Sequence, residues 1–164
     1  RYRSLRDIPH PVCEFVGAPD QLCDLYPWGD AFFLSERAFS IVQALDPDAL
    51  EWIEVDVTGA STKYFLCLCR RSVDAIDDDL STIIVSYKPT HRGSANYYTW
   101  VEAEGGVYTV DESICNGAHV LVNFYTTEVL WSKSAVDSFR IGRCKNLRFR
   151  PTESGELKFE IGLY

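Results

Sequence analysis

The sequence predicts an α+β protein with a mostly antiparallel or mixed sheet and two flanking helices. Short runs typical of strands outnumber the segments with helical periodicity, and an excess of strands over flanking helices indicates this fold class. The two helical segments resemble each other, and each follows a short apolar run and a serine. This similarity predicts two related strand–helix–strand units, at about residues 32–57 and 129–151.

The first 30 residues contain four of the seven prolines and few periodic apolar residues. We interpret residues 1–30 as an irregular N-terminal arm, with at most a short strand over residues 12–16. Residues 31–164 are then expected to form a single α+β domain. A chain of 164 residues is long enough to bury a core without disulfides or a metal ion.

The first predicted unit begins with the apolar run Phe-Phe-Leu at residues 32–34, which is typical of a buried strand. Ser35 follows at the position of a helix N-cap, where its hydroxyl can accept a backbone N–H. Residues 46–48 (Asp-Pro-Asp) end the helix, and the alternation over residues 50–57 predicts the next strand. The apolar residues at helical spacing are Ala38, Ile41, Val42 and Leu45.

The second unit matches the first when Ser132 is aligned with Ser35. Three apolar residues precede each serine, and a strand-like alternation begins fifteen residues after it. Gly142 is the predicted C-cap of the second helix. The copies differ in charge, so one scaffold would carry two opposite surfaces. The charged residues at matching places are Glu51 and Glu54 in the first copy, and Arg148 and Arg150 in the second.

Further strand-like runs lie between the two units, and one run follows the second unit. Cys67 and Cys69 are two residues apart in the first of these runs, so both side chains should point to the same face of the sheet. The runs cover residues 63–70, 81–87, 97–102, 106–110, 119–125 and 155–163.

The net charge of −8 is unevenly distributed. Residues 1–130 contain 9 basic and 20 acidic residues, whereas residues 131–164 contain 7 basic and 4 acidic ones. An acidic body argues against a nucleic-acid partner, because phosphate binding needs a basic surface. It suits a basic protein partner, and it equally suits a surface that only maintains solubility. No apolar run approaches the roughly 20 residues that span a bilayer, so we expect no membrane insertion.

The six cysteines show no metal-binding or redox spacing. We expect them to be small buried hydrophobic residues in a reducing compartment, which predicts a cytoplasmic protein without a metal or other cofactor. A disulfide framework remains an alternative. The chain has no methionine, so we expect that it is not a complete translation product. The oligomeric state is left open.

Local catalytic motifs are missing from the sequence, including the nucleophile elbow, the P-loop and the zinc-protease helix. We therefore predict no catalytic residues. The acidic run over residues 74–79 fits a solvated turn or a negative patch for a cationic partner. The polar loop over residues 88–100 ends in aromatic residues that fit either interface anchors or the core of the next strand. The predicted partner-binding residues are Asp77, Asp78, Asp79, Tyr97, Tyr98 and Trp100.

Three segments together resemble a bacterial immunity-protein family of polymorphic toxin systems, formerly a domain of unknown function and number eleven in the immunity-family numbering. They are "LSERAFSIVQAL…LEWIEV", "YFLCLCRRSVDAID" and "VYTVDESICNGAHVLVNFYTTEVLWSKSAVDSFRIGRCKNLRFRP". The resemblance covers about residues 31–151. It departs from the family pattern at residues 67–69, where an asparagine is expected, and at residues 88–106, which have no counterpart. The resemblance implies a non-enzymatic antitoxin that binds and neutralises a co-encoded toxin, without catalytic residues to transfer.

Two other functional classes are retained. One is a small hydrolase that reverses a toxin's modification, with Cys115, a carboxylate and either His91 or His119 brought together in space. The other is an extracellular binding module stabilised by disulfides.

Overall fold

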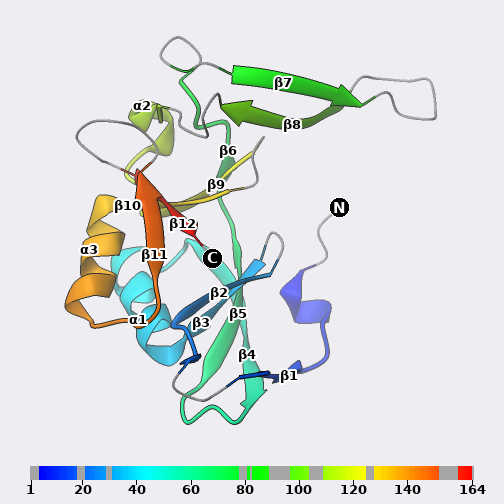
Figure 1. The fold of residues 1–164 in the computed structure, drawn as a ribbon, viewed down its shortest axis with the longest axis vertical. Helices are drawn as coiled ribbons and strands as arrows, with labels where there is room; N and C mark the ends of the chain where they lie inside the picture. Colours follow the sequence, from blue (N-terminus) through cyan, green and yellow to red (C-terminus); the bar gives the residue numbers. More distant parts are fainter. Residues whose placement is uncertain are drawn as a thin grey trace.

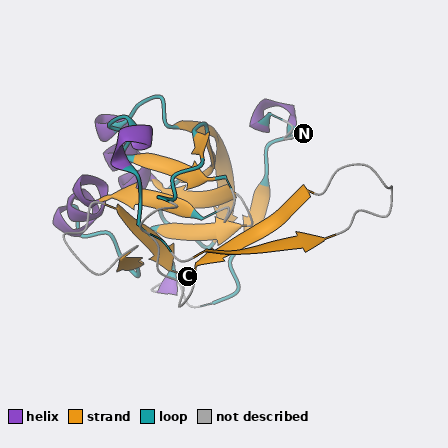
Figure 2. Ribbon diagram, turned by 90° about the horizontal axis from the view of Figure 1, so that it is seen from above, coloured by secondary structure: helices purple, strands orange, loops and turns teal. Residues whose placement is uncertain are grey.

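The computed structural model describes residues 4–17, 21–28, 31–77, 81, 83–88, 97–103, 109–124, 128–151 and 159–163. Within the described part, two five-stranded sheets, a two-stranded hairpin and short helices form an α+β fold with mixed sheets, which confirms the predicted class (Figures 1 and 2). The two five-stranded sheets follow each other along the chain, because the first uses strands up to residue 69 and the second begins at residue 72.

The first sheet has the order β1-β4-β5-β3-β2, with β1 parallel to β4 and the other neighbours antiparallel. Its strands are β1 (Val12–Glu14), β2 (Leu25–Trp28), β3 (Ala31–Ser35), β4 (Leu50–Thr58) and β5 (Tyr64–Cys69). The helix α1 (Glu36–Leu45) connects β3 to β4, and the 3-10 helix η1 (Leu5–Asp7) precedes β1.

The second sheet has the order β11-β12-β10-β9-β6, with β6 parallel to β9 and the other neighbours antiparallel. Its strands are β6 (Ser72–Val73), β9 (Val120–Asn123), β10 (Val129–Ser132), β11 (Arg148–Pro151) and β12 (Phe159–Leu163). The helix α3 (Lys133–Ile141) connects β10 to β11, and α2 (Glu112–Cys115) precedes β9. The hairpin of β7 (Ile83–Lys88) and β8 (Tyr97–Ala103) lies at one end of the molecule (Figure 1).

Each five-stranded sheet contains one copy of the same supersecondary unit. We call β2, β3, α1, β4 and β5 the first unit, and β9, β10, α3, β11 and β12 the second unit. In each unit a hairpin leads into the helix, and the fourth strand pairs with both the second and the third. The structure therefore contains the two predicted strand–helix–strand units and extends each by two strands.

Both helices begin at the predicted serines. The Ser35 hydroxyl accepts a hydrogen bond from the Ala38 N–H at 3.3 Å, and the Ser132 hydroxyl accepts one from the Ala135 N–H at 3.2 Å. Asp46 and Gly142 are the C-caps, as the sequence indicates. A Cβ at position 142 would lie 2.6 Å from Cδ1 of Ile41, so glycine allows the end of α3 to approach α1.

The residues just before the two hairpins, Asp24 and His119, connect the units. In the first unit, the Ser35 hydroxyl donates to the Asp24 carboxylate, which also accepts the Lys145 N–H from the loop after α3. In the second unit, Nδ1 of His119 lies 2.8 Å from the Ser132 hydroxyl, and the His119 N–H donates to the carboxylate of Asp46, at the end of α1. Each unit thus binds the loop that follows the other unit's helix.

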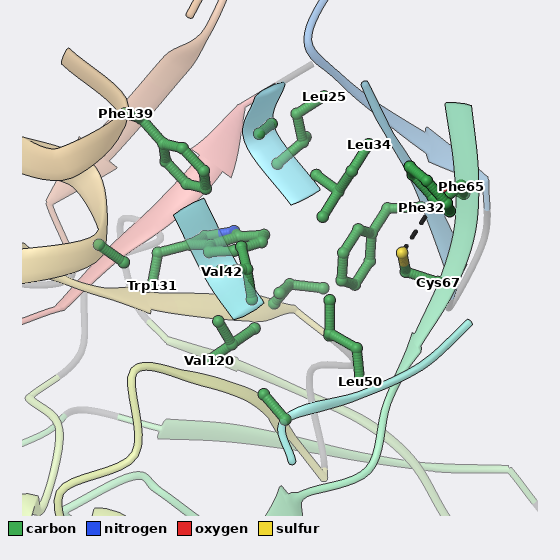
Figure 3. Packing of buried hydrophobic residues seen from close by; sticks show 14 of the residues in the cluster. Leu25, Phe32, Leu34, Val42, Leu50, Phe65, Cys67, Val120, Trp131 and Phe139 are labelled. Carbon is green, nitrogen blue, oxygen red and sulfur yellow. Dashed lines mark hydrogen bonds between the residues drawn. The ribbon is translucent and has the colours of Figure 1, made fainter. Parts of the chain in front are cut away.

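The central core lies between the two helices and the faces of both sheets (Figure 3). Trp131 is fully buried at its centre, with ring centroids 5.5 Å from Phe32 and 5.3 Å from Phe139. Cys67 and Cys69 both face this core, as the two-residue period predicts. Residues from both units contribute to the core, so the units pack as one body.

Most predicted strands are present, and their bounds differ by a few residues. β5, β7, β8, β9 and β12 all correspond to predicted runs. The predicted strand over 106–110 lies mostly outside the described residues, and Val110 forms an isolated bridge with Ile76. The predicted arm contains β1 and β2, both of which pair with the first sheet. The division of the chain into an arm and one domain stays a prediction.

Candidate partner-binding surface

The structure describes only part of the partner-binding residues predicted from the sequence. Asp77 is half-buried, and its backbone N–H donates to the Thr109 carbonyl at 2.9 Å. Asp78 and Asp79 lie outside the described residues. The backbones of Tyr97, Tyr98 and Trp100 belong to β8, but their side chains are not described. The described residues therefore do not test this set, and its role stays a prediction.

The residues of the hydrolase alternative lie around a polar cavity of about 500 Å³ beside β6 and α2. Its lining includes Asp46, Cys115 and His119, whereas His91 lies outside the described residues. The Asp46 carboxylate binds the Arg71 guanidinium and the backbone N–H of His119, and the His119 ring is hydrogen-bonded to Ser132. Asp46 thus contacts the backbone of His119. The ring of His119 contacts Ser132, which caps α3.

The Cys115 thiol is not activated in this arrangement. It donates to the Asp111 carbonyl at 3.4 Å, and burial, followed by the charges of Asp111 and Glu112, raises its pKa to about 11. All six cysteines are free thiols. Within the described ranges, no group of three or more His, Cys, Asp or Glu side chains could hold a metal ion. Cys115 is therefore buried and protonated, so it is not prepared to act as a nucleophile.

A second cavity lies on the face of the first sheet that points away from α1, which we call the outer face. Alternate residues of β3, β4 and β5, including Phe33, Val57 and Leu66, point to this face because side chains alternate along a strand. The N-terminal segment covers part of it. Leu5 packs on the face, and its backbone N–H donates to the Glu51 carboxylate at 2.8 Å. Among the described residues, another part of the outer face stays open.

The open part is an apolar cavity of about 460 Å³, which we call the groove. Among the described residues that line it, Glu14 is the one that carries a charge. The Tyr64 hydroxyl donates to the Cys23 carbonyl at 2.9 Å, and burial, followed by the charge of Asp24, raises the Tyr64 pKa to about 12. The lining residues are Ile8, Pro11, Cys13, Glu14, Phe15, Leu22, Tyr26, Pro27, Trp28, Phe33, Val57, Tyr64 and Leu66.

Exposed aromatic rings border the groove. The Trp28 side chain is 61% exposed and lies 5.8 Å from the Phe33 ring, between centroids. Tyr26 is 39% exposed and makes an edge contact with Phe15 at 6.2 Å. Partly exposed tryptophan and tyrosine beside an apolar cavity are typical anchors of protein interfaces. The groove is therefore the described surface best suited to a protein partner.

Sequence reasoning missed the groove because three of its five aromatic residues lie in the segment interpreted as an irregular arm. Phe15, Tyr26 and Trp28 occur there among prolines and acidic residues. The alternation of Tyr26 and Trp28 around Pro27 is a signal that could have indicated two side chains on one face. Their position beside Phe33 depends on the pairing of β2 with β3, which no local pattern indicated.

Comparison with known proteins identifies a family. The sequence model of the Immunity protein family (Imm11) matches residues 5–154 of this chain. No curated protein matches the chain significantly. Among the described helices, none has the length and apolar character needed to cross a membrane.

Proposed function

Because this chain belongs to the immunity protein family Imm11, we propose that it protects a bacterial cell by binding and neutralising a co-encoded toxin. The family match over residues 5–154 is the observation that carries this proposal, since it spans the first unit, the second unit up to β11 and the N-terminal segment that borders the groove. Neutralisation would result from occupation of the toxin's surface or active cleft.

The structure supports a binding role in two ways. The two units share one core and exchange contacts through Asp24 and His119, which provides a stiff platform with little conformational cost on binding. The groove adds exposed aromatic rings, which slow dissociation when a partner covers them. An acidic chain also favours fast encounter with a basic partner.

Binding without catalysis is part of the proposal. The thiol of Cys115 is buried with a raised pKa, and the Asp46 carboxylate is engaged by Arg71 and a backbone N–H. A Cys115→Ala variant should therefore protect cells as well as the unchanged protein. Intact toxin binding combined with lost protection in this variant would instead favour the hydrolase alternative.

The decisive experiment combines co-purification with growth rescue. The chain is expressed with the product of the neighbouring toxin gene, and we expect a stable complex and restored growth. An unrelated immunity protein serves as the negative control for both measurements. Failure to form a complex, or survival without a complex, would refute neutralisation by binding.

The patch formed by Asp77, Asp78 and Asp79, and the aromatic residues of β8, remain proposed contacts. Reversing the three aspartates to lysine should slow association and weaken its salt dependence if this patch faces the toxin. We also propose a cytoplasmic location, since six free thiols suit a reducing compartment. Cell fractionation tests that location.

A further inference from the structure

The two units differ at matching positions on their outer faces. With Ser35 aligned to Ser132, the strand pairings place Tyr26 opposite Phe33 in the first unit, as Leu121 is opposite Leu130 in the second. Leu121 and Leu130 are 1% and 0% exposed, whereas Tyr26 is 39% exposed. At the next outward position, Trp28 is 61% exposed, and its counterpart Asn123 is fully buried. The same backbone positions are thus closed in one unit and open in the other.

The chain itself provides the cover of the second unit. A cluster of small and apolar residues from the segments around β6 and α2 packs on Leu121 and Leu130. These covering residues are Ala75, Ile76, Val110, Cys115 and Ala118. In the first unit, the N-terminal segment covers only part of the corresponding face and leaves the groove.

From this difference we propose that an apolar segment of the toxin completes the outer face of the first unit by packing into the groove over Trp28 and Tyr26. The inference rests on the proposed function and adds to it the contact surface and the chemistry of the bound segment. The cavity of about 460 Å³ falls in the range of roughly 300–1,000 Å³ that is typical of ligand pockets, so it has room for apolar side chains. Its lining offers apolar contacts and few polar ones, which fits side chains better than a polar metabolite.

The toxin segment binds through side chains and does not extend the sheet as β6 does in the second unit. There, the Val122 N–H donates to the Arg71 carbonyl at 2.8 Å, where β6 lies alongside β9. The matching residue in the first unit is Pro27, which has no N–H to donate. Proline at this edge therefore prevents an added strand from forming the same hydrogen bond.

The acidic charge of the first unit also limits which toxin segments can bind in the groove. Residues 25–69, which form the first unit, contain 2 basic and 7 acidic residues, a net charge of −5. Glu14, the charged residue of the groove lining, is exposed and also acidic. Complementarity favours lysine or arginine residues flanking the apolar side chains of the toxin segment.

The test compares Trp28→Ser with Phe124→Ser in the full-length chain, using the purified toxin as the binding partner. Phe124 follows β9 in the second unit and is 62% exposed, so the two changes remove equally exposed aromatic rings. We expect Trp28→Ser to weaken the complex about 30-fold or more, as at an interface hot spot. Phe124→Ser should change the dissociation constant by less than about threefold. Circular dichroism confirms that both variants are folded.

Hydroxyl-radical footprinting of the unchanged complex gives a second readout that needs no substitution. Toxin binding should protect Trp28 and Tyr26 from oxidation and leave Phe124 accessible. A complex in which Trp28 stays reactive and Trp28→Ser binds normally would overturn the groove assignment and leave the proposed function intact. Absence of toxin binding by the unchanged chain would overturn both proposals.

Discussion

The first and second units show how one backbone arrangement can serve two purposes. Both have a serine-capped helix after a hairpin, and both contribute one sheet face to the common core. They differ in what lies on the opposite face. In the second unit the chain buries Leu121 and Leu130, and in the first unit it leaves Trp28 and Tyr26 exposed. Duplication of the fold thus conserves the core while leaving one outer face available for recognition.

Charge separates the units in the same way. Residues 25–69 carry a net charge of −5, whereas residues 120–163 contain 7 basic and 5 acidic residues, a net charge of +2. Shared packing does not require shared surface charge, because solvated charges contribute little to stability. The surface charge of the two units can therefore differ without loss of the common core.

The largest expected effect tests whether the outer face of the second unit is covered more completely than the outer face of the first unit. Leu130→Ala, in the closed unit, should lower the free energy of unfolding by about 3 kcal/mol, because it removes a fully buried side chain. Phe33→Ala, at the matching position of the open unit, should cost less than about 2 kcal/mol despite the larger side chain. Urea unfolding measures both values. Equal losses would show that the first unit is as closed as the second.

The next effect concerns Asp46, which binds Arg71 and the backbone N–H of His119. Asp46→Asn removes an ion pair with Arg71 and should cost about 2 kcal/mol. Burial raises the pKa of Asp46, but the hydrogen bond and charge of Arg71, with the His119 N–H, offset this and hold the pKa below its ordinary 3.8. The carboxylate therefore stabilises the fold fully above pH 3.8 and loses this contribution as the pH falls through its folded pKa.

Measuring the free energy of unfolding at a series of pH values checks the direction of this pH dependence. The unchanged chain should lose stability steeply below pH 3.8, and Asp46→Asn should show a shallower dependence in the same interval. If the stability of Asp46→Asn depended on pH in the same way as that of the unchanged chain, Asp46 would contribute nothing to the loss of stability in acid.

A smaller effect tests the equivalence of the helix caps. Ser35→Ala and Ser132→Ala should each lower the free energy of unfolding by about 1 kcal/mol, because each removes the acceptor for one helix N–H. The two losses should agree within measurement error if the units are structurally equivalent. A clear difference would indicate that Asp24 and His119 support their serines unequally.

The smallest expected effect concerns charge at the groove. Glu14→Lys should slow toxin association about threefold at low salt, and the difference should shrink as salt is added. Asp48→Lys, an exposed change in the turn after α1, alters net charge equally and serves as the control. Identical association rates for the two variants would assign the effect to overall charge.

The sequence patterns predicted those parts of the fold that depend on neighbouring residues. The positions of Ser35 and Ser132 before helical periodicity identified both caps, and the alternation of Cys67 and Cys69 gave their common face. The short edge strand β2 was not predicted, because Pro27 interrupts it and its pairing with β3 is a tertiary contact.

The candidate site depended on information that no local pattern contains. The groove exists because residues around β6 and α2 cover one sheet and no equivalent described segment fully covers the other. The bond between Asp46 and His119 joins positions 73 residues apart, and α2 is only four residues long. Such features arise from the packing of distant segments, which residue order alone does not specify.

The reciprocal bonds of Asp24 and His119 have a consequence for cutting the chain. Because each sheet is built from one continuous half of the polypeptide, separation near residue 70 would leave both sheets whole. Each piece alone would lack the loop of the other unit that binds the residue before its hairpin, Asp24 or His119. Each piece should therefore be unstable by itself. Produced together, the two pieces should find one another and reconstitute the parent molecule, much as two subunits assemble into a dimer.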